Sequence, residues 1–189
     1  YYGGRWRRSD VAGLYDLCVG PLFAERGFRF VVQTTRGRFD SEGEFVPGRT
    51  ERADGQATLA WLARRPWFDG NLGMWGASYP GHAQWAVAWD APPYLKALVP
   101  AITASSLSGL LFPDGVPADF CLLYPCAMEV AADRSATTLS MLARANPMTM
   151  GRTLGPAFNH LPAGEADVAA KRRPVAYYRE WLAHPPPDE

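Results

Sequence analysis

A serine flanked by small residues stands out in the stretch "NLGMWGASYPGHAQWAVAW", which covers residues 71–89. Gly76 lies two residues before Ser78, and Gly81 lies three residues after it. A serine hydroxyl can attack a carbonyl carbon when it projects from a sharp turn and backbone N–H groups face the oxyanion that forms. Small neighbours let the backbone pass tightly through such a turn. We therefore predict Ser78 as a nucleophile, with the alternative that it only caps the following helix.

The elements around this serine alternate between strand and helix patterns. Short apolar runs rich in aromatic or β-branched residues predict strands at 28–35, 71–76 and 94–100. Capped helical patterns predict helices at 11–26, 50–66 and 79–90, with Thr50 capping the second. The segment 36–49 is rich in glycine and charge and is predicted as a loop. This alternation predicts an α/β domain with a parallel sheet, and it places Ser78 between a strand and a helix.

The second half of the chain has a different pattern. No strand is predicted after Pro100, and helical patterns occupy most of residues 117–185, with a break at Pro174. We therefore predict a partial α/β core at residues 1–108 and an incomplete helical cap region at 109–189.

Composition limits the kinds of partner. Lys plus Arg equals Asp plus Glu, at 19 each, so no nucleic-acid partner is predicted. No apolar run reaches the roughly 18 residues of a membrane span, and no signal peptide is visible, which favours a cytoplasmic location. Cys18, Cys121 and Cys126 lack metal-site spacing and are expected to be buried thiols. We predict no cofactor and no metal; the oligomeric state stays open.

A family resemblance rests on three motifs. "GNLGMWGASYPGHAQWAVAWDAPPYLKALVP", preceded by "TRGRFDSEGEF" and "DGQATLAWLARRPWFDG", resembles the X-Pro dipeptidyl-peptidase-like serine hydrolases, which include esterases and acylases. The likeness covers nearly all of residues 1–108. It implies an α/β-hydrolase fold with a helical cap, and hydrolysis of a small ester, amide or peptide through a serine ester.

The resemblance also implies site residues. Ser78 would be the nucleophile, and the backbone N–H of Tyr79 would donate to the oxyanion. The family's second donor is a tyrosine hydroxyl from a Pro-Tyr-Gly-like segment, which Tyr2 matches, although Tyr1 stands where proline is expected. The family often has Gln-Asp-x-Arg-Gly at the strand end, and here Thr34 stands in place of that aspartate. We interpret Arg36 and Asp40 as loop-structuring rather than catalytic.

The remaining catalytic residues are not found in the sequence. The family's acid and histidine follow the cap, and none of His82, His160 or His184 matches that histidine. Asp167 and Asp188 are in helical or tail context and are not assigned as the acid. We therefore expect the chain to be a fragment, weak or inactive alone, whose acid and histidine lie beyond its last residue.

Two further alternatives stay open. Six aromatic residues of the second half either line a substrate pocket or form ordinary core: Phe112, Phe120, Tyr124, Tyr177, Tyr178 and Trp181. The alternative to an enzyme is a non-catalytic α/β-hydrolase-like binding module that keeps the serine turn as a scaffold. Such a module would have an unreactive Ser78.

Overall fold

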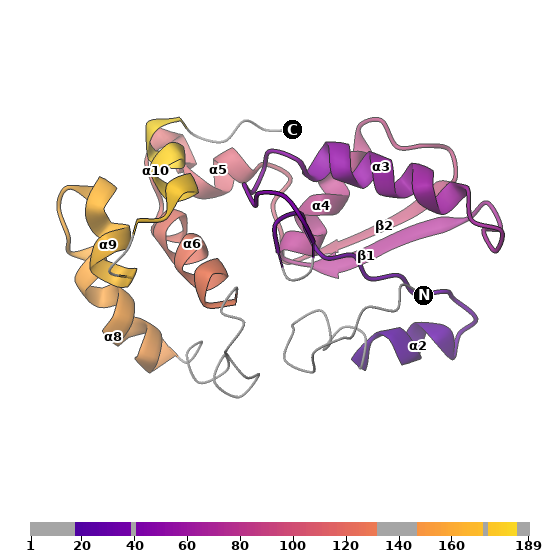
Figure 1. Ribbon diagram of the computed structural model, residues 1–189, viewed down its shortest axis with the longest axis horizontal. Helices are drawn as coiled ribbons and strands as arrows, with labels where there is room; N and C mark the ends of the chain where they lie inside the picture. The colour runs from indigo at the N-terminus through magenta and orange to yellow at the C-terminus, as the bar shows by residue number, and fades with distance from the viewer. Residues whose placement is uncertain (1–17, 39–40, 132–146, 172–173, 185–189) are drawn as a thin grey trace. The chain divides into compact units, whose positions relative to one another are not determined.

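The computed structural model describes residues 18–38, 41–131, 147–171 and 174–184 (Figure 1). Contacts divide the chain into two compact units. One unit holds the residues up to Phe45 together with Leu122–Val175, and the other holds Val46–Cys121 together with the segment that begins at Ala176. Helices and a small parallel sheet make up the regular structure of the described residues, which is compatible with a partial α/β fold. The predicted domain division at residue 108 stays a prediction.

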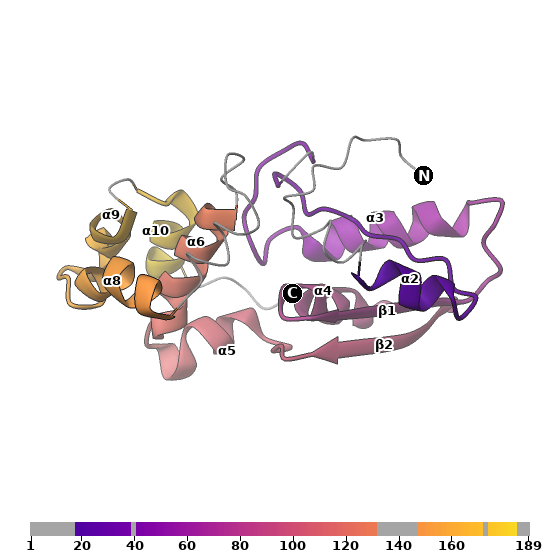
Figure 2. The ribbon, with the colours of Figure 1, turned by 90° about the horizontal axis from the view of Figure 1, so that it is seen from below.

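A parallel pair of strands forms the centre of the unit that contains Ser78. β1 (Leu72–Ala77) pairs with β2 (Leu95–Ala101) along its whole length (Figure 2). Helix α4 (Tyr79–Ala88) connects the two strands and packs on both. A helical crossover is the usual way to join parallel neighbours, because a short hairpin cannot do so. Both strands and this helix are confirmed as predicted.

Helix α3 (Glu51–Ala63) packs against α4. The two helices approach closely at Gly55, where an added Cβ would lie 2.4 Å from Cγ1 of Val87. Leu59 and Leu62 of α3 are buried, as their spacing on one helical face predicts. The close approach fixes α4 between α3 and the strands, and with it the turn that precedes α4.

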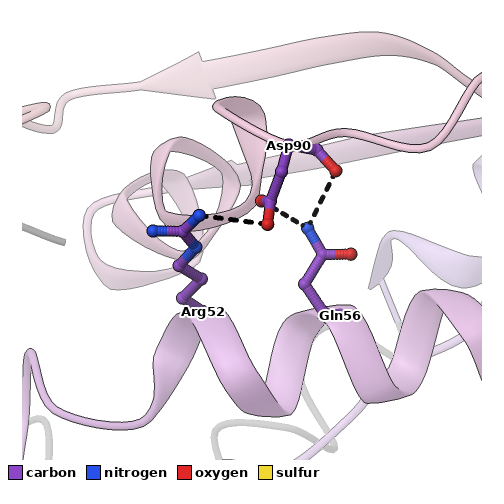
Figure 3. A network of polar contacts seen from close by, with 3 residues as sticks. All are labelled: Arg52, Gln56 and Asp90. Atoms are coloured by element: carbon purple, nitrogen blue, oxygen red, sulfur yellow. Dashed lines mark hydrogen bonds and ion pairs between the residues drawn. The ribbon is translucent and has the colours of Figure 1, made fainter.

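A polar network joins α3 to the end of α4 (Figure 3). Nη2 of Arg52 donates to Oδ2 of Asp90 at 3.0 Å, and Nε2 of Gln56 donates to Oδ1 of Asp90 at 2.7 Å. The same Gln56 nitrogen also donates to the Asp90 carbonyl oxygen at 3.2 Å. All three contacts are exposed, so they fix the relative register of the helices more than they stabilise the fold.

The ends of α3 correct two details of the prediction. Thr50 stands at the N-cap position, but its side chain makes no capping bond. The Glu51 carboxylate accepts the Thr50 backbone N–H instead, at 3.1 Å. The helix ends at Ala63, before the predicted end at residue 66.

The strand predicted at 28–35 is wrong, because these residues form no strand in the structure. They belong to a different compact unit from β1 and β2. Of the helix predicted at 11–26, residues 11–17 lie outside the described residues. Its end is present as α2 (Gly20–Ala24), with Pro21 in its first turn. Proline is tolerated in the first turn, where its missing N–H would have no partner within the helix.

The described residues after β2 form helices and no strand, as predicted. The helices are α5 (Leu107–Leu111), η1 (Pro113–Gly115), α6 (Asp119–Ala131), α8 (Pro147–Phe158), η2 (Ala163–Glu165), α9 (Ala166–Lys171) and α10 (Ala176–Ala183). In one unit α8 packs on α9. In the other, Arg49 forms an ion pair with Glu180 of α10.

The cysteines differ from one another in exposure. Cys121 is buried, and burial raises the pKa of its thiol to about 11. Cys18 is exposed, which corrects the expectation that it is buried. The side chain of Cys126 lies outside the described residues. None of the described helices is both long and apolar enough to cross a membrane.

Candidate active site

Ser78 occupies the turn between β1 and α4 with φ 61° and ψ −125°. Positive φ is uncommon for a residue with a Cβ and costs about 1–3 kcal/mol, so the surrounding structure must hold it. The Ser78 N–H donates to the carbonyl of Ala101 on β2 at 2.8 Å. The Ser78 carbonyl accepts the N–H groups of Gly81 and His82 at 2.9 and 3.0 Å. Sheet and helix thus fix this residue from both sides.

The side chain of Ser78 is not used as a helix cap. Ser78 stands at the N-cap position of α4, yet its hydroxyl makes no capping hydrogen bond, and the residue is exposed. Ser106 provides the contrast within the same unit, because its Oγ accepts the Gly109 N–H at 2.7 Å at the start of α5. The capping alternative for Ser78 therefore has no support in its contacts.

Both glycines of the serine turn (residues 76–81) sit where a Cβ has no room. A Cβ on Gly76 would lie 2.5 Å from Cβ of Pro80, and a Cβ on Gly81 would lie 2.7 Å from Cγ2 of Thr103. Neither glycine is needed for its backbone conformation, since neither has a positive φ. They are needed because α4 starts directly against the end of β1 and against the segment that follows β2.

Tyr79, the first residue of α4, is anchored to α3 through its side chain. Its hydroxyl donates to Oε1 of Glu51. Glu51 is buried, and its other carboxylate oxygen accepts the Thr50 N–H. A buried carboxylate is costly unless it is hydrogen-bonded, and these two bonds satisfy it. The residue that follows Ser78 is therefore held at both its backbone and its side chain.

Two residues near the serine turn were not predicted as site residues. They are Glu51, the first residue of α3, and Gln84 on α4. Gln84 is fully buried on α4 and hydrogen-bonds to the backbone on either side of Ser78. The available signal was a polar residue at a core position of an otherwise apolar helix, which implies buried partners.

Among the described residues of the unit that holds Ser78, no histidine or carboxylate pairs with the Ser78 side chain. His82 is buried, and neither ring nitrogen has a hydrogen-bond partner among the described residues. Nε2 of His160 lies 3.6 Å from Oε2 of Glu165, and both residues follow α8 in the chain. His184 follows α10. Asp188 and Tyr2 lie outside the described residues.

Asp167 has a structural position. It is completely buried at the start of α9, and its two carboxylate oxygens accept the N–H groups of Val168 at 2.8 Å and Val175 at 2.7 Å. These bonds tie the start of α9 to the segment that leads to α10. The prediction that Asp167 is not the catalytic acid agrees with this use of its oxygens.

The loop that contains Arg36 is closed on itself. Gly43 has φ 93°, and a Cβ there would lie 2.9 Å from Cγ of Arg36. The guanidinium of Arg38 stacks on the Phe45 ring at 3.9 Å, and Thr34 Oγ1 lies 2.6 Å from Ser41 Oγ. The packing of Arg36 agrees with a loop-structuring position; Asp40, which shares this loop, lies outside the described residues.

The six aromatic residues of the second half are mostly core. All but Phe120 are buried: Phe112, Tyr124, Tyr177, Tyr178 and Trp181. Tyr177 and Trp181, one turn apart on α10, meet edge to face with ring centroids 5.4 Å apart. Within the described residues there is no group of three or more His, Cys, Asp or Glu side chains that could hold a metal ion.

The sequence of this chain matches the X-Pro dipeptidyl-peptidase (S15 family) over residues 2–186. The chain belongs to this family. It is also 45% identical over 85 residues to cocaine esterase from Rhodococcus sp. (strain MB1 Bresler). That match covers 45% of this chain and 15% of the esterase, so the chain spans a minor part of this relative's length.

Proposed function

We propose that the chain carries the nucleophile of a serine hydrolase, and that Ser78 is this nucleophile. The observation that supports it best is the strained backbone of Ser78 at a strand-to-helix turn, with an exposed side chain that caps nothing. Strain of this kind persists only where the fold holds it, and it is concentrated at functional sites. Membership of the S15 family and the likeness to an esterase agree with the proposal.

The proposed reaction is acyl transfer to water. Ser78 Oγ attacks the substrate carbonyl carbon and loses its proton to a base, and the C–O or C–N bond to the leaving group then breaks. Water hydrolyses the resulting serine ester. The N–H of Tyr79 stands at the positive end of α4, where it would stabilise the oxyanion, and the Tyr2 hydroxyl would be the second donor.

The base and its orienting carboxylate are proposed to come from outside residues 1–189. No histidine of the chain matches the family position, and the match to cocaine esterase covers 15% of that protein. We therefore propose that the chain works within a longer protein and is inactive by itself. Because a triad acts as a unit, a serine without its base retains little of the rate.

The substrates are proposed to be small molecules or short peptides with an ester or amide bond. The family name refers to an X-Pro dipeptidyl-peptidase and the relative is named an esterase, and both reactions cleave an acyl bond. A serine turn with one oxyanion site serves either bond, since the same tetrahedral intermediate forms in each case.

The test is covalent labelling of the complete encoded protein with a fluorophosphonate probe, followed by peptide mapping. We expect label on Ser78 and none in the Ser78→Ala variant. Ser106→Ala is the matched control, because Ser106 also starts a helix but its hydroxyl is occupied as a cap. An unlabelled wild-type protein, or equal labelling of Ser78→Ala, would refute the proposal and favour a non-catalytic binding module.

A further inference from the structure

Gln84 is the most completely buried polar side chain of α4, with no exposed surface. Its Oε1 accepts the N–H of Val99 on β2 at 2.8 Å. Its Nε2 lies 3.1 Å from the carbonyl oxygen of Pro80 and 3.4 Å from those of Gly76 and Val99. One side chain thus contacts the backbone of β1, α4 and β2.

Two of these partners lie on either side of Ser78 in the sequence. Gly76 is two residues before the serine and Pro80 is two residues after it. Because a primary amide has two N–H donors and one acceptor oxygen, the arrangement uses both kinds of group. A buried amide that lost these partners would pay the full cost of desolvation, which makes the arrangement hard to distort locally.

Close steric contacts also hold the residues of the serine turn that Gln84 contacts. Gly76 and Pro80 are so close that a Cβ on Gly76 would lie 2.5 Å from Cβ of Pro80. The Ser78 N–H reaches β2 at Ala101, two residues beyond the Val99 that Gln84 contacts. Gln84 therefore connects β1, which precedes Ser78, with α4, which follows it, and with β2, to which the Ser78 N–H is bonded.

We propose that Gln84 is a positioning residue for Ser78: its amide holds the two ends of the serine turn and β2 at fixed spacing. This proposal rests on the proposed function, in which Ser78 is the nucleophile. Gln84 touches no reacting atom. It acts through the backbone, because a nucleophile displaced by about 1 Å loses on the order of 100-fold in rate.

The test compares variants of the complete encoded protein. Gln84→Met keeps the approximate length of the side chain and removes both donor and acceptor. Gln84→Glu keeps an acceptor for the Val99 N–H. It replaces the N–H donor to the carbonyls of Gly76 and Pro80 by a carboxylate oxygen, which cannot donate. Gln56→Met is the matched control, because Gln56 on α3 also joins two elements, but its hydrogen bonds among the described residues go to the exposed Asp90 (Figure 3).

Two rates are measured well below the melting temperature of every variant: fluorophosphonate labelling of Ser78, and turnover of a 4-nitrophenyl ester. We expect labelling and kcat to fall about 10- to 100-fold in both Gln84 variants, with KM changed less than about 2-fold. A merely structural residue would lower the melting temperature and the folded fraction without changing the rate per folded molecule. Gln56→Met should leave both rates unchanged.

The outcomes distinguish the positioning proposal for Gln84 from the nucleophile proposal for Ser78. If wild-type Ser78 is labelled and the folded Gln84 variants are labelled at the same rate, the positioning proposal is wrong and the nucleophile proposal stands. If both Gln84 variants fail to fold, the positioning proposal is also wrong, because the residue is then required for folding itself. If wild-type Ser78 is not labelled, the nucleophile proposal fails first.

Discussion

Replacing Gly76 by alanine tests how tightly the serine turn is built. Gly76 ends the part of β1 that meets the start of α4, and the new Cβ would lie 2.5 Å from Cβ of Pro80. Its next contacts, with the carbonyl carbon and Cα of Pro80 at 3.4 and 3.5 Å, are tolerable. The clash is therefore with the rigid pyrrolidine ring of Pro80, which cannot rotate away as a flexible side chain would.

The distance between the two Cβ atoms gives the size of the displacement in Gly76→Ala, and from it the loss of stability and reactivity. To bring the two Cβ atoms from 2.5 Å to an ordinary contact of 3.4 Å, Pro80 must move by about 0.9 Å relative to β1. Overpacking of this kind costs about 1–3 kcal/mol of stability. The displacement falls on the residues that flank Ser78, so reactivity should fall on the order of 100-fold as well.

Gly73→Ala on the same strand is the control. Its Cβ would meet the Ala97 oxygen at 3.7 Å and the Ala97 Cβ at 3.8 Å, which are ordinary contacts. This variant should match or exceed the wild type in stability by about 0.4–1 kcal/mol, because alanine restricts the unfolded chain. Denaturant unfolding and fluorophosphonate labelling are measured for both. Wild-type stability and labelling rate in Gly76→Ala would refute the steric reasoning.

Three further predictions concern regions away from Ser78. In the native protein a thiol reagent such as DTNB should modify exposed Cys18 before buried Cys121, whose raised pKa keeps it protonated at neutral pH; equal rates would contradict this. The hydrogen bond from Arg52 holds the pKa of Asp90 below its ordinary value, so this interaction stabilises the fold above the ordinary carboxyl pKa and its contribution is lost as pH falls through the lowered one. Arg52→Met should raise the Asp90 pKa measured by carboxyl NMR, and no change would show that the pair is not formed in solution. Gly151→Ala in α8, where a Cβ meets nothing within 4 Å, should stabilise the protein by about 1 kcal/mol in denaturant unfolding.

The elements around Ser78 could be predicted because local signals agree there. Residues 71–76 and 94–100 are short apolar runs with turn residues at their ends, and 79–90 is an alanine-rich helical stretch. The crossover helix between two parallel strands follows from these signals without knowledge of tertiary contacts. The absence of strands among the described residues after β2 could be predicted in the same way.

The wrong strand prediction at residues 28–35 has a different origin. Its aromatic and β-branched residues have high strand propensity, but propensity does not supply a hydrogen-bonding neighbour. The Thr50 cap was also wrong, because the Thr50 side chain makes no capping bond. Glu51 accepts the Thr50 backbone N–H and is contacted by the hydroxyl of Tyr79, which is distant in sequence.

The same limit explains why the contacts that hold Ser78 could not be predicted, although the strand-to-helix turn that contains it could. A serine between two glycines is a local pattern, but the conformation with φ 61° depends on Ala101, Gln84 and Glu51, which come from three different elements. The Ser78 N–H bond to Ala101 requires β2, which follows α4 in the chain and pairs with β1. A serine turn of this kind is therefore a property of the whole β1–α4–β2 unit packed on α3. The strain of about 1–3 kcal/mol at Ser78 is offset only when all of these contacts exist together, so changes at buried Gln84 or Gly76 should reach the serine without touching it.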